Sequence, residues 1–524
     1  MMRTLILLAL LAPLANGQQL DLLIHGGRVI DGAGNPWFRA DVGIRGAEIV
    51  ALGQLGGASA KRVIDAGGQI VAPGFIDAHN HSRRRILQVP ASENFVRQGV
   101  TTIVEGNDGS SPIPLNDFFE KVRAAKVSIN YASFIGHGSV RREVMGAADR
   151  KATAEEIEQM RSLVRRGMSQ GALGLSSGLF YVPGAFAPTE EVIELAKVAA
   201  ASGGIHISHM RDEAAGLLDS VNETIQIGEE GGLPTQLTHH KAIGPGNWGK
   251  SVQTLELVER ARARGVDVSI DQYPYTASHT GTAALFPKWV LADGGETVKA
   301  RLRNPELRQE IIEEVAEIIR VDRGGGAPKN VQFSSCEWDP SLDGKTLADA
   351  TRLAGRQVNF ETAAETAIEI QLKGGCRAVY HAMNEEDVER IMRYPGTMIA
   401  SDGAVIPFGE GVPHPRYYGT FPRVLGLYAR EKGILTLTDA IRKMTSLPAQ
   451  RIGFFDRGLL RPGMKADVVV FDPDEIVDRA EFGDSHKYSE GVSYVIVNGG
   501  VVLDDGEMTD SRPGQILLGP GAAD

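Results

Sequence analysis

The chain has 524 residues, and 55 lysines and arginines against 66 aspartates and glutamates give a formal charge of −11. This acidic balance argues against nucleic acid or an anionic membrane surface as the main partner. Because one hydrophobic core rarely grows beyond about 250–300 residues, the chain should divide into more than one domain. Its two cysteines, Cys336 and Cys376, exclude a disulfide scaffold and a cysteine-rich zinc finger. Sequence leaves open whether they pair with each other.

The first 17 residues have the pattern of an export signal. Arg3 precedes an apolar run over residues 5–15, and the small residues Ala15 and Gly17 follow. A positive start, a short apolar core and small residues at the cleavage position are typical of a signal peptide. The run is too short to cross a bilayer, which needs about 20 residues. We therefore expect cleavage near Gly17, a periplasmic or secreted protein, and no membrane insertion.

Both ends of the mature chain have the pattern of antiparallel strands. Residues 20–72 alternate apolar and polar side chains in short segments separated by glycine and aspartate, and residues 465–506 repeat this style. Neither piece is long enough for a convincing sheet alone. We therefore predict one small discontinuous β-sandwich domain built from residues 18–72 and 456–524.

The middle of the chain, residues 73–455, alternates short apolar strands with amphipathic helices. The predicted strands lie at 101–106, 172–178, 204–210, 235–240, 266–275, 377–383 and 397–403, and helices at 152–170, 189–204 and 438–447. Such alternation favours a parallel (β/α)8 TIM-type barrel over two small doubly wound domains. The charged stretch 296–323 predicts helices inserted between barrel strands, near 285–345, with their charges on a solvated face.

Histidines cluster where predicted barrel strands end. His79 and His81 are two residues apart, in phase with Asp77, so both imidazoles face the same way and are placed to share a metal ion. His209 ends a second strand and His239 a third. Barrel enzymes keep their active sites at the C-terminal ends of the strands. We therefore expect these histidines to converge, together with Asp402, which ends the strand at 397–403.

These motifs resemble a known family. The pair after PGFID, single histidines on two later strands and a late aspartate are similar to the metal-dependent amidohydrolase superfamily. GALGLSSGLFYVPG, SHMRDE, HHK, YPY, SDG and HPRYYGTFPRVLG resemble the D-aminoacylase (N-acyl-D-amino-acid deacylase) family over almost the whole mature chain. The resemblance implies a zinc-dependent hydrolase that cleaves the amide bond of N-acyl-D-amino acids and releases a carboxylate and a free D-amino acid. The expected substrate is therefore a small molecule.

The resemblance also implies roles for individual residues. It makes His209 and His239 ligands of a tightly held zinc ion, and His79 and His81 ligands at a second, weaker position. It makes Asp402 the catalytic acid and base. The implied substrate-binding residues are Lys241, Tyr273 and Arg416, of which Arg416 receives the substrate carboxylate.

Two positions depart from the family pattern. Where the family has a metal-binding cysteine in its VGNCG motif, this chain reads VEGNDG and places Asp108, with Glu105 three residues earlier. We expect Asp108 to be the bridging ligand because it aligns with that cysteine, and Glu105 is the alternative. A carboxylate is a harder ligand than a thiolate and shifts preference from Zn²⁺ towards metals such as Mn²⁺. His279 stands where a serine is usual, in the predicted substrate region. A dipeptidase, a cyclic-amide hydrolase or a metal-free binding protein are the alternative functions, and the oligomeric state is open.

Overall fold

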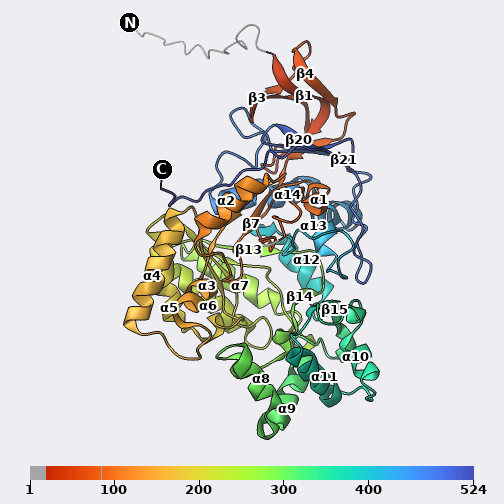
Figure 1. Cartoon of the computed structure of the whole chain (residues 1–524). Helices are drawn as coiled ribbons and strands as arrows, with labels where there is room; N and C mark the ends of the chain where they lie inside the picture. Colours follow the sequence, from red (N-terminus) through yellow and green to blue (C-terminus); the bar gives the residue numbers. More distant parts are fainter. Residues whose placement is uncertain (1–18, 84, 524) are drawn as a thin grey trace.

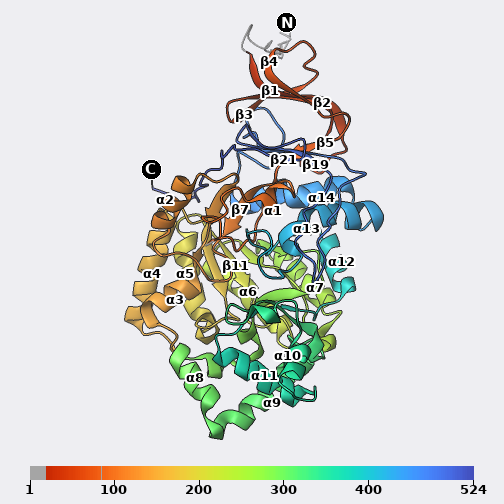
Figure 2. The same ribbon diagram turned by 45° about the vertical axis from the view of Figure 1, so that its right-hand side comes forward.

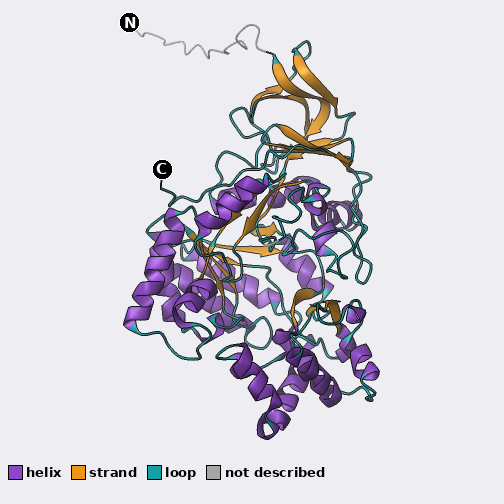
Figure 3. Cartoon of the chain, in the orientation of Figure 1, coloured by secondary structure: helices purple, strands orange, loops and turns teal. Residues whose placement is uncertain are grey.

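The computed structural model describes residues 19–83 and 85–523, so the predicted signal peptide lies outside the described residues. Three parts follow one another along the molecule: a β-domain, a central barrel wrapped by helices, and a mostly helical lobe (Figure 1). The turned view in Figure 2 shows the same arrangement. Figure 3 shows strands concentrated in the β-domain and inside the barrel.

The β-domain is a nine-stranded sheet formed by both ends of the chain. The strand order is β21-β20-β19-β18-β5-β1-β2-β3, with β4 paired to β1. The strands are β1 (Leu20–Val29), β2 (Phe38–Arg45), β3 (Glu48–Gly53), β4 (Ala60–Asp65), β5 (Ile70–Pro73), β18 (Val468–Phe471), β19 (Val492–Val497), β20 (Gly500–Asp504) and β21 (Glu507–Met508). The sheet encloses an apolar cluster in which Ile24 and Val42 meet Val470 and Ile496. The predicted β-domain built from the two ends is therefore present.

The barrel consists of short parallel strands whose C-terminal ends point to one mouth. They are β6 (Phe75–Asp77), β7 (Val100–Glu105), β8 (Asn130–Ser133), β9 (Ile135–Gly136), β10 (Gly174–Gly178), β11 (Ile205–His209), β12 (Thr235–Leu237), β13 (Val268–Gln272) and β17 (Thr397–Ile399). Only Phe134 separates β8 from β9, so the two form one strand position and the barrel has eight. Asn80 bridges Gly403 in parallel, which closes β17 onto β6. The predicted TIM-type barrel is confirmed.

Helices cover the outside of the barrel. They are α1 (Glu93–Val96), α2 (Leu115–Ala125), α3 (His137–Met145), α4 (Ala154–Ser169), α5 (Thr189–Ala200), α6 (Leu217–Gly231), α7 (Ser251–Ala263), α12 (Glu385–Arg393), α13 (Arg416–Arg423), α14 (Leu437–Met444) and α15 (Ser446–Ile452), with the short turns η1 (Gly184–Phe186) and η2 (Pro245–Asn247) and the π-helix η7 (Val424–Glu431). A capping box between Thr153 and Glu156 starts α4, and its buried face carries Met160 and Val164. No helix among the described residues is long and apolar enough to cross a membrane.

The helical lobe is an insertion between β13 and β17. It contains a three-stranded antiparallel sheet of β14 (Ser278–Gly281), β15 (Val331–Ser335) and β16 (Arg377–Tyr380). Its helices are α8 (Gly295–Arg303), α9 (Pro305–Val321), α10 (Leu347–Leu353) and α11 (Phe360–Leu372), with the short turns η3 (Thr282–Leu285), η4 (Lys288–Leu291), η5 (Pro328–Asn330) and η6 (Pro340–Leu342). A separate apolar cluster forms its core.

The insertion corrects two predictions. The segment 377–383 was predicted as a barrel strand, but β16 pairs with β14 and β15, so the insertion extends beyond 285–345. A short apolar strand looks the same in either sheet, and only its pairing partners differ. The charges of 296–323 do not all face solvent, since Arg323 is buried. The pairing left open for Cys336 and Cys376 is a disulfide.

Candidate metal centre and active site

Six polar residues follow five barrel strands and meet at the mouth. His79 and His81 follow β6, Asp108 follows β7, and His209 ends β11. The remaining two, His239 and Asp402, follow β12 and β17. In a parallel barrel the C-terminal ends of all strands lie on one side, which brings together residues far apart in the sequence. The structure thus gathers the predicted histidines and Asp402 into one cluster.

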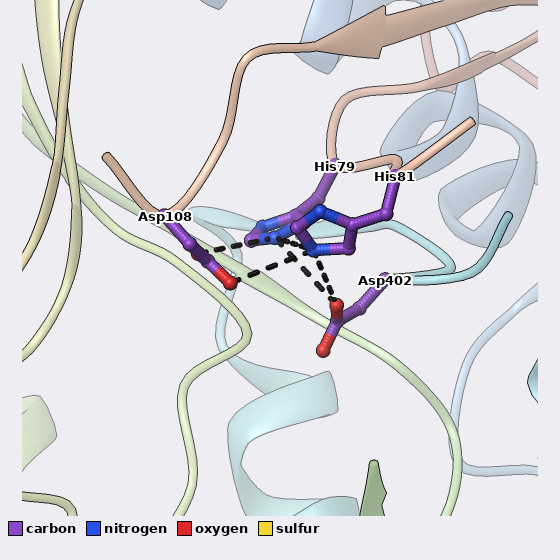
Figure 4. Close-up of side chains that lie close together, drawn as sticks. All are labelled: His79, His81, Asp108 and Asp402. Carbon is purple, nitrogen blue, oxygen red and sulfur yellow. Dashed lines mark hydrogen bonds and ion pairs between the residues drawn. The ribbon is translucent and has the colours of Figure 1, made fainter. Parts of the chain in front are cut away.

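Asp108 lies at the centre of this cluster. Its Oδ1 is 3.4 Å from His79 Nε2 and 3.4 Å from His239 Nε2. Its Oδ2 is 3.5 Å from His81 Nε2 and 3.5 Å from His209 Nδ1. Figure 4 shows Asp108 and Asp402 on either side of the imidazoles of His79 and His81. One carboxylate therefore faces both pairs of histidines.

The backbone is strained at three of these positions. Asp108, His239 and Asp402 have φ angles of 53°, 36° and 49°, in the left-handed region that non-glycine residues rarely adopt. Such conformations cost about 1–3 kcal/mol each and concentrate at functional sites. Here the strain turns two carboxylates and one imidazole into the mouth at the ends of β7, β12 and β17.

The donor atoms fit divalent metal ions. One group contains His79, His81, Asp108 and Asp402, and the other contains Asp108, His209 and His239, with donor atoms in each group within 4.8 Å of one another. Imidazole nitrogens and carboxylate oxygens are common zinc ligands. The Oδ1 of Asp108 is buried without a hydrogen-bond donor among the described residues, which suits an oxygen that binds a cation. Asp108 would bridge two ions.

Charge around Asp108 favours its ionised form. Burial alone would raise the pKa of Asp108, but the adjacent imidazoles of His79, His239 and His209 outweigh burial and hold it well below its usual value. Burial lowers the pKa of His209 to about 4, which keeps this imidazole neutral as a ligand must be. At the other three histidines the neighbouring carboxylates outweigh burial and raise the pKa, to about 9 for His81, so a metal ion binding there would release protons.

Glu105, the alternative bridging ligand, does not join the cluster. Its carboxylate accepts hydrogen bonds from the backbone N–H groups of Arg83 and Gly106, the latter at 2.8 Å. It lines the cavity but belongs to neither group of potential ligands. The chain turns after β7, and three residues later this turn presents Asp108 instead.

A buried ion network lies behind His209 and His239. Glu213 accepts hydrogen bonds from Lys241 Nζ and, at 2.9 Å, from Arg323 Nη2. Its carboxylate is also 3.2 Å from His239 Nδ1 and 3.7 Å from His209 Nε2. All five side chains are buried. Burial opposes ionisation of Glu213, yet the ammonium of Lys241 and the two imidazoles hold its pKa well below the usual value.

Asp402 has its own cationic partner. Arg416, the first residue of α13, places Nη1 2.9 Å from Asp402 Oδ2, while Asp402 Oδ1 is 3.0 Å from His81 Nε2. His414 orients this arginine, because its Nδ1 accepts the backbone N–H of Arg416 at 3.0 Å. The ring of Tyr273 lies 4.7 Å from the Arg416 guanidinium. These contacts fix the Asp402 carboxylate at the edge of the cluster.

The mouth opens into a cavity of about 1000 Å³ between the barrel and the insertion. Of the predicted metal and catalytic residues, six line it: His81, Glu105, Asp108, His209, His239 and Asp402. Lys241 and His279, predicted to bind substrate, also line it. Tyr273 and Arg416 do not. Both are buried beneath the wall, Tyr273 under the Arg416 guanidinium and Arg416 against Asp402.

Comparison with known proteins agrees with this site. The model of the amidohydrolase family matches residues 62–503. A D-aminoacylase of Alcaligenes xylosoxydans xylosoxydans is 37% identical, with 96% of this chain and 98% of the relative aligned. An N-acyl-D-glutamate deacylase of the same organism is 38% identical, with 95% of this chain and 97% of the relative aligned.

The solved structures agree. The N-acyl-D-glutamate deacylase of Bordetella bronchiseptica, complexed with zinc and a phosphonate mimic of the tetrahedral intermediate, superposes with a TM-score of 0.82 at 36% identity, covering 96% of this chain and all of the other. This chain belongs to the D-aminoacylase family of amidohydrolases.

In this member of the D-aminoacylase family, some site residues were missed by sequence reasoning. Arg323, at the end of the charged insertion stretch, lines the cavity and binds Glu213. Glu213, four residues after His209 in the sequence, contacts the ligand histidines. Arg377 lines the cavity from β16. For Arg323 and Arg377 no local sequence signal pointed to the site, because the insertion brings them there from outside the barrel pattern.

Proposed function

We propose that this protein hydrolyses the amide bond of N-acyl-D-amino acids and releases a carboxylate and a free D-amino acid. The observation that supports this most is the Asp108-centred cluster with Asp402 beside it, at the mouth of a barrel that aligns with D-aminoacylase over nearly its whole length. The D configuration rests on the relatives, because no contact in the cavity reports the handedness of a substrate.

The residues fit one or two zinc ions. His209, His239 and Asp108 would hold one ion, and His79, His81 and Asp402 would hold a second that shares Asp108. A zinc ion bound there polarises the amide carbonyl and lowers the pKa of water to about 7. The carboxylate-rich donor set also suits Mn²⁺.

Asp402 is placed to move the proton. Its carboxylate is on the cavity wall, so it can accept a proton from the attacking water as the oxygen–carbon bond forms. The same group can then give that proton to the amine nitrogen as the carbon–nitrogen bond breaks. Arg416, 2.9 Å away, stabilises the anionic form of Asp402 and fixes its direction.

The test is a substrate panel combined with metal analysis. The purified protein should contain about one or two zinc ions per chain and should cleave N-acetyl-D-amino acids but not their L-isomers. Dipeptides and hydantoins, the substrates of the alternative functions, belong in the same panel. Cleavage of only these, or of no acylated amino acid, would refute the proposal.

We also propose that the protein works outside the cytoplasm. The pattern of residues 1–17 supports export, and so does the Cys336–Cys376 disulfide, because disulfides persist in oxidising compartments. Expression of the full chain in a Gram-negative host should give a mature protein whose intact mass corresponds to a start near residue 18. Full-length protein confined to the cytoplasmic fraction would contradict export.

A further inference from the structure

The sheet of the insertion turns a polar face towards the cavity. In the register of β14 against β16, His279 lies opposite Val379 and Gly281 lies opposite Arg377. Opposed residues share a face, and so do residues two apart along a strand. His279 and Arg377 are therefore diagonal neighbours on one face, and both line the cavity.

His279 Nδ1 faces both the guanidinium of Arg377 and the hydroxyl of Tyr417, the latter at 3.3 Å. Arg377 Nη2 lies 3.4 Å from His279 Nδ1, and His279 Nε2 lies 2.7 Å from Ser334 Oγ. Arginine can only donate, so Nδ1 accepts, and Nε2 carries the hydrogen and donates to Ser334. Burial lowers the pKa of His279 well below 6.5, and the charges of Arg377 and Arg416 lower it further, which keeps the ring neutral.

Most N–H donors of the Arg377 guanidinium have no partner among the described residues. Among the described residues it has no carboxylate partner, and its one hydrogen bond is the contact with His279. Of the other cations that line the cavity, three have carboxylate partners: Arg85 pairs with Glu410, and Lys241 and Arg323 share Glu213. The remaining two have other contacts, since Arg83 donates to Ser110 and Lys373 lies over the ring of Trp338. Arg377 is exposed and lines the cavity.

His279 also connects Arg377 to Asp402, through Arg416. The backbone oxygen of His279 lies 3.4 Å from Arg416 Nη2, and the Nη1 of that arginine lies 2.9 Å from Asp402. The volume of about 1000 Å³ is at the upper end for small-molecule sites. A substrate held at the cluster therefore has room to extend a further group towards Arg377.

We propose that Arg377, oriented by His279, forms a subsite for a second carboxylate of the substrate, in addition to the α-carboxylate. The inference rests on the proposed function and sets the substrate class within it. The second carboxylate comes either from an acidic D-amino-acid side chain or from a dicarboxylic acyl group. A planar guanidinium binds either one through two parallel N–H donors.

The test compares substrate pairs that differ in one charge. The first pair is N-acetyl-D-glutamate and N-acetyl-D-glutamine, and the second is N-succinyl-D-methionine and N-butanoyl-D-methionine. In wild type the charged member of one pair should be preferred. Arg377→Met should lower that preference, the ratio of the two kcat/KM values, by about 10- to 100-fold, as expected for losing a charge-assisted hydrogen bond. The pair that responds identifies the source of the carboxylate.

Two further variants distinguish direct binding of the carboxylate by Arg377 from a non-specific effect of positive charge in the cavity. Arg85→Met removes a cavity cation that Glu410 already neutralises, and its ratio should stay within about twofold of wild type. His279→Gln should raise KM for the charged substrate more than it changes kcat. An unchanged ratio in Arg377→Met, or an equal fall in Arg85→Met, overturns the subsite. Absence of cleavage of all four substrates by wild type would instead refute the proposed function.

Discussion

The two pairs of histidines around Asp108 are built differently. His209 and His239 are 3% and 2% exposed, and the Glu213–Lys241–Arg323 network fixes them from behind. In the other pair His79 is buried, with Asp271 Oδ1 3.6 Å from its Nδ1, but the side chain of His81 is 33% exposed and its ionic partners are Asp108 and Asp402. Groups that support a ligand from behind raise metal affinity. We therefore expect the deeper pair to retain its ion and the outer pair to exchange it readily.

Asp108 serves both pairs, so its removal should have the largest effect. Asp108→Ala should empty both positions and lower kcat/KM by more than the roughly 10- to 100-fold that loss of a supporting group costs. Asp108→Cys, which restores the residue usual in the family, should retain zinc. Metal analysis and N-acetyl-D-methionine hydrolysis measure both. Full zinc content in Asp108→Ala would show that Asp108 is only a turn residue.

Changing one histidine in each pair tests the difference between the pairs. His209→Asn should lose the deeply bound ion and nearly all activity, because this ligand belongs to the buried group. His81→Asn should keep about one ion per chain after dialysis, because the group of His209 is left intact. Equal metal loss in the two variants would mean that burial does not distinguish the two positions.

Glu213→Gln should lower zinc affinity only at the position held by His209 and His239. The substitution keeps the shape of the side chain but removes the charge between Lys241 and Arg323, and zinc affinity should fall about 10- to 100-fold. Glu191→Gln is the matched control, since Glu191 is also buried and pairs with Arg141 and His137 away from the cluster. Each variant should lose about 3–5 kcal/mol of stability. Competition with a chelator should show weaker zinc binding only in Glu213→Gln.

The smallest expected effect is on the pH dependence of stability, and it comes from His206 in β11. Burial, with smaller contributions from His137 and Arg451, lowers the pKa of His206 to about 3. The folded protein therefore binds fewer protons than the unfolded chain between about pH 6.5 and 3. The stability due to neutral His206 is complete above pH 6.5 and falls by about 1.4 kcal/mol per pH unit below it.

His206→Gln should remove that slope. Urea unfolding at pH 7, 6 and 5, at saturating zinc, should show a flatter decline than wild type. His25→Gln, at a side chain 55% exposed, is the control and should follow the wild-type profile. An unchanged slope in His206→Gln would mean that His206 gains a proton without unfolding.

Sequence predicted the parts of the site that local patterns encode. His209 and His239 each come at the end of a short apolar strand, so the barrel rule was enough to bring them together. The choice between Asp108 and Glu105 needed the backbone turn after β7, which periodicity does not report. Arg323 and Arg377 escaped prediction because tertiary packing of the insertion, rather than strand phase, brings them to the cavity. Tyr273 was expected to touch substrate but lies beneath Arg416.

The sheet of the β-domain constrains the order in which the molecule can assemble. Val71 of β5 pairs with Val470 of β18, so the sheet cannot be completed until the whole barrel has left the ribosome. Closing so long a loop becomes easier once a folded barrel has brought its two ends close together. Until then β5 presents an unpaired edge, which is a site for misassociation between chains. The C-terminal strand β18, made late in synthesis, therefore covers the edge of the N-terminal strand β5.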